Sequence, residues 1–123
     1  MNIEKFTLKS QEAIKNSVDL AIKKQNQFVV PMHLLEAILE TNDNVIESLI
    51  EKSGGNLELL KDKTKKELSK IPSVSGENIE STFSQEYNLL LLKAKELADK
   101  SNDTYITLER LFQAFFILFF CFY

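Results

Sequence analysis

The chain has 123 residues, and its 15 basic and 18 acidic side chains give a formal charge of −3, which suits a single domain with one core. The acidic balance argues against a surface that neutralises phosphates, so we expect no nucleic-acid partner. Cys121 is the single cysteine, so no intrachain disulfide can form. Because the N-terminus also lacks an apolar run before a cleavage site, we expect a cytoplasmic protein.

The first helix is predicted after Thr7, a residue type that caps helix N-termini. Its apolar stripe recurs at three- and four-residue steps, which is typical of one face of an α-helix: Ala13, Ile14, Ser17, Val18, Ala21 and Ile22. Val29 and Val30 are expected to be extended because Pro31 follows them, and the proline suits the first position of a second helix.

Two shorter helices are predicted next. Asp43 starts the third helix, and Gly54 and Gly55 end it, where a left-handed cap is favoured. Asn56 caps the fourth helix, which carries Leu57, Leu60 and Leu68.

Residues 71–83 form a linker, because Pro, Ser and Gly gather there and the helical periodicity lapses. Ser84 then caps a fifth helix, and Thr107 caps a sixth with Glu109 in its first turn, where a carboxylate suits the helix dipole.

The two halves of the chain repeat each other. When Phe28 is aligned with Tyr105, an offset of 77 residues (105 − 28), "NQFVVPMHLLEAILE" lies on "NDTYITLERLFQAFF". Residue size and polarity agree through two helices and the extended junction between them. A shared register of this kind indicates an internal duplication.

The copy is incomplete. A full second repeat would add two helices matching residues 43–70, but the chain instead has "AFFILFFCFY", which carries no charge. The run from Leu111 to Tyr123 is shorter than the roughly 20 residues of a membrane span. We therefore expect a truncated second repeat that is less stable than the first, with the apolar end either folding back over its core or pairing two chains.

Catalytic chemistry is missing from the sequence. There is no phosphate-binding GxxxxGK[ST] loop and no cluster with metal-ligand spacing, so we expect no cofactor, no metal and no enzyme activity in this chain. His33, alone on a helix, is more typical of a packing or surface residue than of a catalyst. Cys121 lies in an apolar run, and such thiols are inert rather than nucleophilic.

Several segments, in order, resemble the Clp amino-terminal domain and, within it, the bacterial ClpB disaggregase branch: "FTLKSQEAIKNSVDLA", "FVVPMHLLEAIL", "IPSVSG" and "DTYITLERLFQA". The resemblance implies an all-α fold of two pseudo-symmetric Clp repeats of short helices, the second repeat incomplete. On this basis we divide the chain into a first repeat (1–70), a linker (71–83), a truncated second repeat (84–116) and a hydrophobic tail outside the family pattern (117–123).

The resemblance also implies a function. The family's domain is tethered to an AAA+ ATPase ring and helps engage unfolded or aggregated polypeptide in an apolar groove edged by polar residues. The matching positions here are Thr7, Leu91, Leu97, Asp103 and Glu109. Two further groove positions, apolar in the family, are Lys93 and Arg110 in this chain, so the groove is less apolar there.

Each of these residues also has a structural interpretation. Thr7 and Glu109 suit helix termini, Asp103 suits a turn, and Leu91 and Leu97 suit a core. Two other functions stay open. One is a module that binds adaptor proteins, and the other is a membrane-associated fragment held by residues 111–123. A helix-turn-helix DNA-binding protein is disfavoured because no basic recognition face is present.

Overall fold

The computed structural model describes residues 2–76 and 80–119. Cys121 and the last residues of the predicted hydrophobic tail, 120–123, lie outside these ranges. The described part contains six α-helices: α1 (Leu8–Lys23), α2 (Pro31–Leu39), α3 (Asn44–Lys52), α4 (Leu57–Ser69), α5 (Gln85–Lys100) and α6 (Leu108–Phe119). A short 3-10 helix, η1 (Ile3–Lys5), precedes them. The all-α prediction is confirmed.

The predicted helix starts are confirmed by their caps. Thr7, Asp43, Asn56 and Ser84 each accept a hydrogen bond from a backbone N–H in the first turn, and the Thr107 hydroxyl accepts one from Arg110 at 3.3 Å. These bonds satisfy N–H groups that have no partner within the helix.

The end of α3 is closed by the predicted glycine pair. The Gly54 N–H donates to Glu51 O and the Gly55 N–H to Ile50 O, at 3.0 and 2.9 Å. Gly54 has φ of 85°, a left-handed conformation that costs glycine little.

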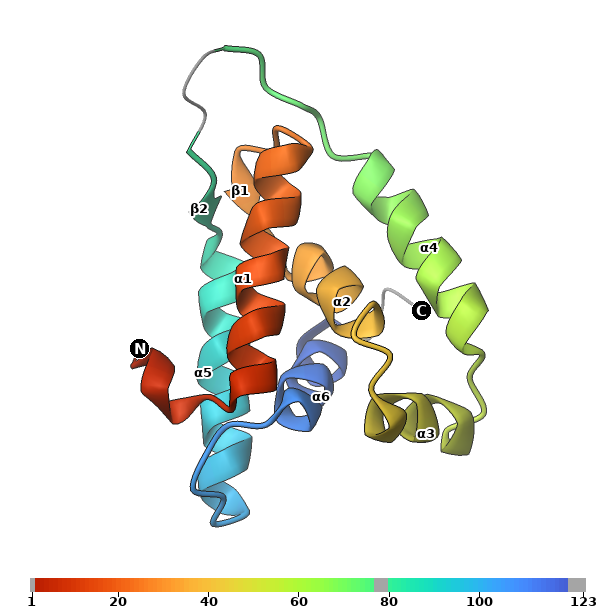
Figure 1. Cartoon of the computed structure of the whole chain (residues 1–123), viewed down its shortest axis with the longest axis vertical. Coiled ribbons are helices and arrows are strands. Elements are labelled where there is room, and N and C mark those ends of the chain that lie inside the picture. The colour runs from red at the N-terminus through yellow and green to blue at the C-terminus, as the bar shows by residue number, and fades with distance from the viewer. Residues whose placement is uncertain (1, 77–79, 120–123) are drawn as a thin grey trace.

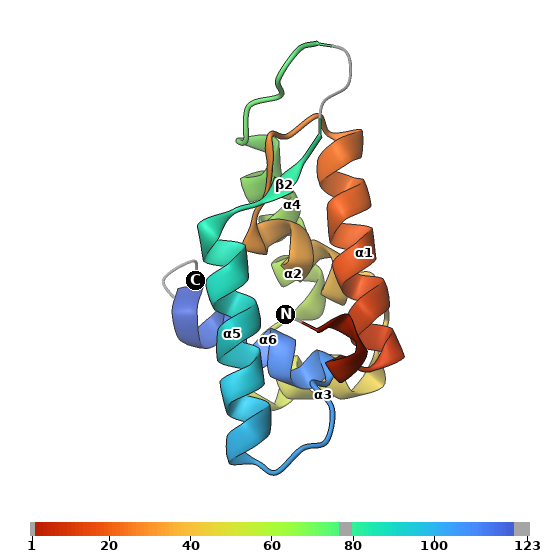
Figure 2. The same ribbon diagram turned by 90° about the vertical axis from the view of Figure 1, so that its left-hand side faces the viewer.

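The core lies around α2. Figure 1 shows α4 along one side of the molecule, and Figure 2 shows α2 and α6 between the two long helices α1 and α5. Because α1, α4 and α6 all pack on α2, eight of its nine residues are buried. The apolar face of α6, with Leu111, Ala114 and Phe115, completes this core. The helix continues past residue 116 to Phe119.

A two-stranded parallel sheet, which the sequence did not predict, ties the halves together. Strand β1 (Phe28–Val29) pairs with β2 (Thr82–Phe83). Of the two strands, β2 lies at the end of the segment expected to be a linker. A second parallel bridge joins Phe6 to Ile106. With the 77-residue offset, Phe6 corresponds to Phe83 and Val29 to Ile106, so the two pairings are copies of one another. The internal duplication therefore extends to contacts between the halves.

Candidate functional site

The Phe6–Ile106 bridge brings the start of α1 against the start of α6. The Thr7 N–H donates to Ile106 O at 3.1 Å, and the Ile106 N–H donates to Lys5 O at 2.7 Å. The buried Ser10 hydroxyl also donates to Ile106 O, at 3.0 Å. These bonds place Thr7, at one end of the chain, beside the segment that leads into Glu109.

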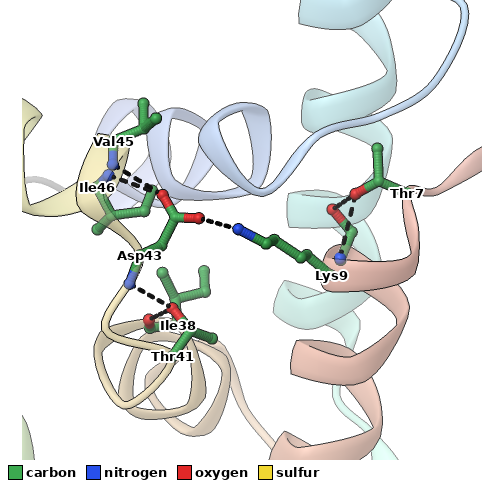
Figure 3. A network of polar contacts seen from close by, with 8 residues as sticks. Thr7, Lys9, Ile38, Thr41, Asp43, Val45 and Ile46 are labelled. Atoms are coloured by element: carbon green, nitrogen blue, oxygen red, sulfur yellow. Dashed lines mark hydrogen bonds and ion pairs between the residues drawn. The ribbon is translucent and has the colours of Figure 1, made fainter.

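Thr7 is half-buried and occupied with structural contacts (Figure 3). Its hydroxyl oxygen accepts from the Ser10 N–H at 3.2 Å, and its hydroxyl donates to Ser10 Oγ at 3.0 Å. Ser84, its counterpart in the second repeat, caps α5 in the same way by accepting from the Tyr87 N–H at 3.1 Å. Thr7 thus has a capping role that is independent of any ligand.

Asp103 is paired with Arg110. The Arg110 Nε donates to Asp103 Oδ2 at 2.9 Å, and both side chains are about one-quarter exposed, at 28% and 26%. Arg110 Nη1 also donates to Gln113 Oε1 at 2.8 Å. Arg110 therefore supplies a cation that engages the carboxylate of Asp103.

The first repeat contains a neutral version of this pair. Asn26 corresponds to Asp103 and His33 to Arg110, and His33 Nε2 lies 2.7 Å from Asn26 Oδ1. The Val30 N–H donates to His33 Nδ1 at 2.9 Å, so Nε2 carries the proton and donates to Asn26. The imidazole is fully buried, and burial, with repulsion from Lys24, lowers the pKa of His33 to about 4. The structure thus gives His33 a packing role, as its sequence context indicated.

Leu91 and Leu97 lie on α5, both half-buried and packed against the core. They stand three residues before and three residues after the fully buried Ala94. At 3.6 residues per turn, these positions fall on opposite edges of the buried stripe. Lys93, another position named by the resemblance, is part-exposed and lies 3.6 Å from Glu96 in an ion pair.

Glu109 is half-buried in the first turn of α6. Among the described residues, its carboxylate makes no hydrogen bond or ion pair. Its counterpart in the first repeat is Met32, so Glu109 has no equivalent acid there. Of the predicted polar trio, Glu109 is the residue whose side chain makes no hydrogen bond or ion pair within the described residues.

The two segments joined by the Phe6–Ile106 bridge carry three exposed apolar side chains: Ile3 at 47%, Leu8 at 82% and Tyr105 at 53% exposure. None of them was singled out from the sequence. Leu8 lies off the apolar stripe of its helix, on the face that carries Glu12 and Lys15. An apolar residue on a polar face is the signal that could have found it.

Neither a metal site nor a membrane-crossing helix is found in residues 2–76 and 80–119. No group of three or more metal-ligating side chains gathers there, and none of these helices is long and apolar enough to cross a membrane.

Comparisons with known proteins agree with this architecture. A family model described as "Clp repeat (R) N-terminal domain" matches residues 5–117. The chaperone protein ClpB of Rickettsia felis is 40% identical over 115 residues, which cover 93% of this chain and 13% of that protein. The ClpB of Clostridium perfringens is 32% identical over 117 residues, covering 93% of this chain and 14% of the relative.

Solved structures share the fold. The Hsp104 N-terminal domain from Candida albicans matches with a TM-score of 0.80 at 24% identity, covering 89% of this chain and 71% of that one. The complex of the ClpV N-domain with VipB peptide matches with a TM-score of 0.77 at 20% identity, covering 98% and 72%. The family model and the curated relatives span nearly all of the chain, which therefore belongs to the Clp repeat N-terminal domain family.

Proposed function

We propose that this chain is the polypeptide-engaging domain of a ClpB-type chaperone, and that it holds unfolded or aggregated segments for an AAA+ ATPase ring. The observation that carries the proposal is the surface around the Phe6–Ile106 bridge. There, the exposed Ile3, Leu8 and Tyr105 lie on the same two segments as Thr7 and Glu109. We call these five residues the bridge surface.

The bridge surface offers the two kinds of contact that an unfolded chain needs. The apolar side chains gain roughly 25 cal/mol for each Å² they remove from water on binding. The Glu109 carboxylate can accept hydrogen bonds from backbone N–H groups or pair with a cation, because within the described residues it has no other partner. Few groups are involved, so the binding is weak and tolerant of sequence, which suits a domain that passes chains onward.

The second candidate is an adaptor-binding module. It is favoured by the likeness to the ClpV N-domain, whose solved complex contains a VipB peptide. This function predicts tight binding of one particular partner and no binding of unrelated unfolded chains. The two candidates therefore differ in selectivity, which titration against several permanently unfolded polypeptides measures.

The test is an amide-resolved NMR titration of the full chain with a soluble, permanently unfolded polypeptide. We expect shifts centred on Thr7, Tyr105 and Glu109. The variant Leu8→Ser should weaken binding by about five-fold or more, because roughly 1 kcal/mol of apolar contact is lost. Leu59→Ser is the matched control, since Leu59 is also an exposed helical leucine, at 67%, but lies on α4. Equal losses in the two variants, or shifts that avoid the bridge surface, would refute the proposal.

A further inference from the structure

A pocket of 540 Å³ lies between the end of α1, the helix α2 and the second half of α4. Its volume is within the range of about 300–1,000 Å³ found for ligand pockets. Two glutamates, three lysines and two leucines line it, so it combines both signs of charge with an apolar wall. It shares no residue with the bridge surface.

Glu36, from α2, carries an unsatisfied acceptor in this pocket. The residue is 6% exposed, and its Oε1 is the one buried side-chain nitrogen or oxygen of the described residues that has no hydrogen-bond partner. Lys65 Nζ lies 3.8 Å from this oxygen, which is too long for a hydrogen bond, and instead donates to Glu40 Oε1 at 3.2 Å. A buried acceptor without a donor costs free energy, so a ligand that brings a donor to Glu36 Oε1 is favoured.

The negative charge of Glu36 is also poorly compensated. Burial raises the pKa of its carboxyl, and the neighbouring Glu40 raises it further. In the second repeat the counterparts of Glu36 and Glu40 are Gln113 and Ile117, which lie in α6. A helix therefore forms at this place in the repeat without an acid at either position, and the two carboxylates are a feature of the pocket and not a requirement of the fold.

Lys23 and Lys24 bring the opposite charge to the pocket from the end of α1. Among residues 2–76 and 80–119, neither side chain makes a hydrogen bond or ion pair. Lys24 lies close enough to Glu36 to offset part of the rise in its pKa. Leu20, half-buried on α1, and Leu68, buried on α4, supply the apolar wall.

We infer that this pocket binds a free α-amino acid with an aliphatic side chain. Its α-ammonium group donates to Glu36 Oε1, and its α-carboxylate pairs with Lys23 and Lys24. The aliphatic side chain packs on Leu20 and Leu68. A ligand with both charges fits because a cation alone would be repelled by the lysines, and an anion alone would leave the Glu36 oxygen unsatisfied. The inference is independent of the proposed function.

The test is an amide-resolved NMR titration of the full chain with L-leucine and two analogues. One analogue is 4-methylpentanoate, which is leucine without its ammonium group, and the other is isopentylamine, which is leucine without its carboxylate. We expect saturable shifts at Leu20, Lys24 and Glu36 with leucine, and about ten-fold weaker binding of each analogue, since each lacks one set of charge-assisted hydrogen bonds. Leucine should also raise the thermal unfolding midpoint, because it binds only the folded chain.

Two variants connect the binding to these side chains. Glu36→Gln keeps the shape of the side chain without its charge and should weaken leucine binding by about five-fold or more. Lys24→Gln should weaken it by about two- to five-fold, and this half-buried position at a helix end gives a measurable variant if the Glu36 variant does not fold. Glu51→Gln and Lys52→Gln, both exposed on α3 and outside the pocket, are the matched controls and should leave the affinity unchanged.

Four results would overturn the inference. One is the absence of saturable shifts with leucine. Equal binding of isopentylamine would show that the lysines take no part, and equal binding of 4-methylpentanoate would show that Glu36 takes none. Unchanged affinity in Glu36→Gln would assign the buried oxygen to a water molecule or to a proton shared with Glu40. None of these results bears on the binding of unfolded polypeptide to the bridge surface, so the proposed function is tested separately.

Discussion

Phe6→Ala and Phe83→Ala remove the same side chain from equivalent positions of the two repeats, yet their costs should differ. Phe6 is 3% exposed and belongs to the core, whereas Phe83 is 41% exposed. Truncating a fully buried phenylalanine costs about 3–5 kcal/mol, because a cavity is left in addition to the lost transfer free energy. Phe83 buries little more than half of its ring, beside Tyr87 at 4.7 Å. Its loss opens to solvent, so about 1–2 kcal/mol is expected.

Urea unfolding followed by circular dichroism measures both costs. With a slope of about 1.5 kcal/mol per molar urea, the midpoint should fall by about 2–3 M for Phe6→Ala and by about 1 M for Phe83→Ala. A domain of this size has only about 5–15 kcal/mol of stability, so Phe6→Leu, at about 1–1.5 kcal/mol, provides a measurable variant if the alanine protein does not fold. Equal midpoint shifts in the two alanine variants would refute the reasoning from burial.

Thr7→Ala should cost about 1 kcal/mol through loss of the α1 cap, and Ser84→Ala should cost about as much through loss of the α5 cap. Urea midpoints measure both costs. Thr7→Ser keeps the capping hydroxyl and should therefore keep the stability of the original chain. If Thr7→Ala leaves stability unchanged but abolishes polypeptide binding, the capping role is secondary. Because the pKa of His33 is lowered to about 4 from about 6.5 in the unfolded chain, the unfolded state binds more protons between these values. The free energy of unfolding should therefore fall as the pH drops from 6.5 toward 4, by roughly 3 kcal/mol at most. The same slope in a His33→Gln variant would contradict this assignment. Asp103→Asn should cost less than about 1 kcal/mol, since the pair with Arg110 is part-exposed. A loss of several kcal/mol in thermal unfolding would show that the pair is integral to the fold. Asp43→Ala removes the α3 cap, which accepts from two N–H groups, and should cost about 1 kcal/mol. Lys9→Ala removes only the ion pair between Lys9 and Asp43 and should change the unfolding midpoint little. The opposite order would show that this ion pair, and not the cap, stabilises the start of α3.

Local patterns were sufficient to predict the helices and their starts. Thr7, Asp43, Asn56 and Ser84 have side chains that accept from the first turn of a following helix, and this interaction spans only three residues. Gly54 likewise ends α3 through bonds within one turn. The 77-residue offset was also predictable, because a duplicated sequence carries its register with it. The two-residue strands were not, since a pair of residues is too short to show alternation.

Of the candidate site, the resemblance supplied Thr7, Asp103 and Glu109, and their roles in binding stay predictions. The tertiary structure separates them: Thr7 caps a helix, Asp103 pairs with Arg110, and Glu109 has no partner among the described residues. It also places Leu91 and Leu97 on opposite edges of one buried stripe of α5. The spacing of the two leucines does not give this arrangement by itself, because the position of the buried stripe must be known first.

The sequence by itself determined that the two halves are built alike, because propensity, capping and periodicity act along the chain. Only the tertiary structure decided how equivalent positions differ. Asn26 and His33 form a neutral, buried pair, whereas Asp103 and Arg110 form a charged, part-exposed one. Burial depends on which distant segments cover a position, and the charged form of a side chain is stable only where water or a partner reaches it. Phe6 and Phe83 differ for the same reason, because the burial of each ring is set by contacts made across the fold and not by its place in the repeat.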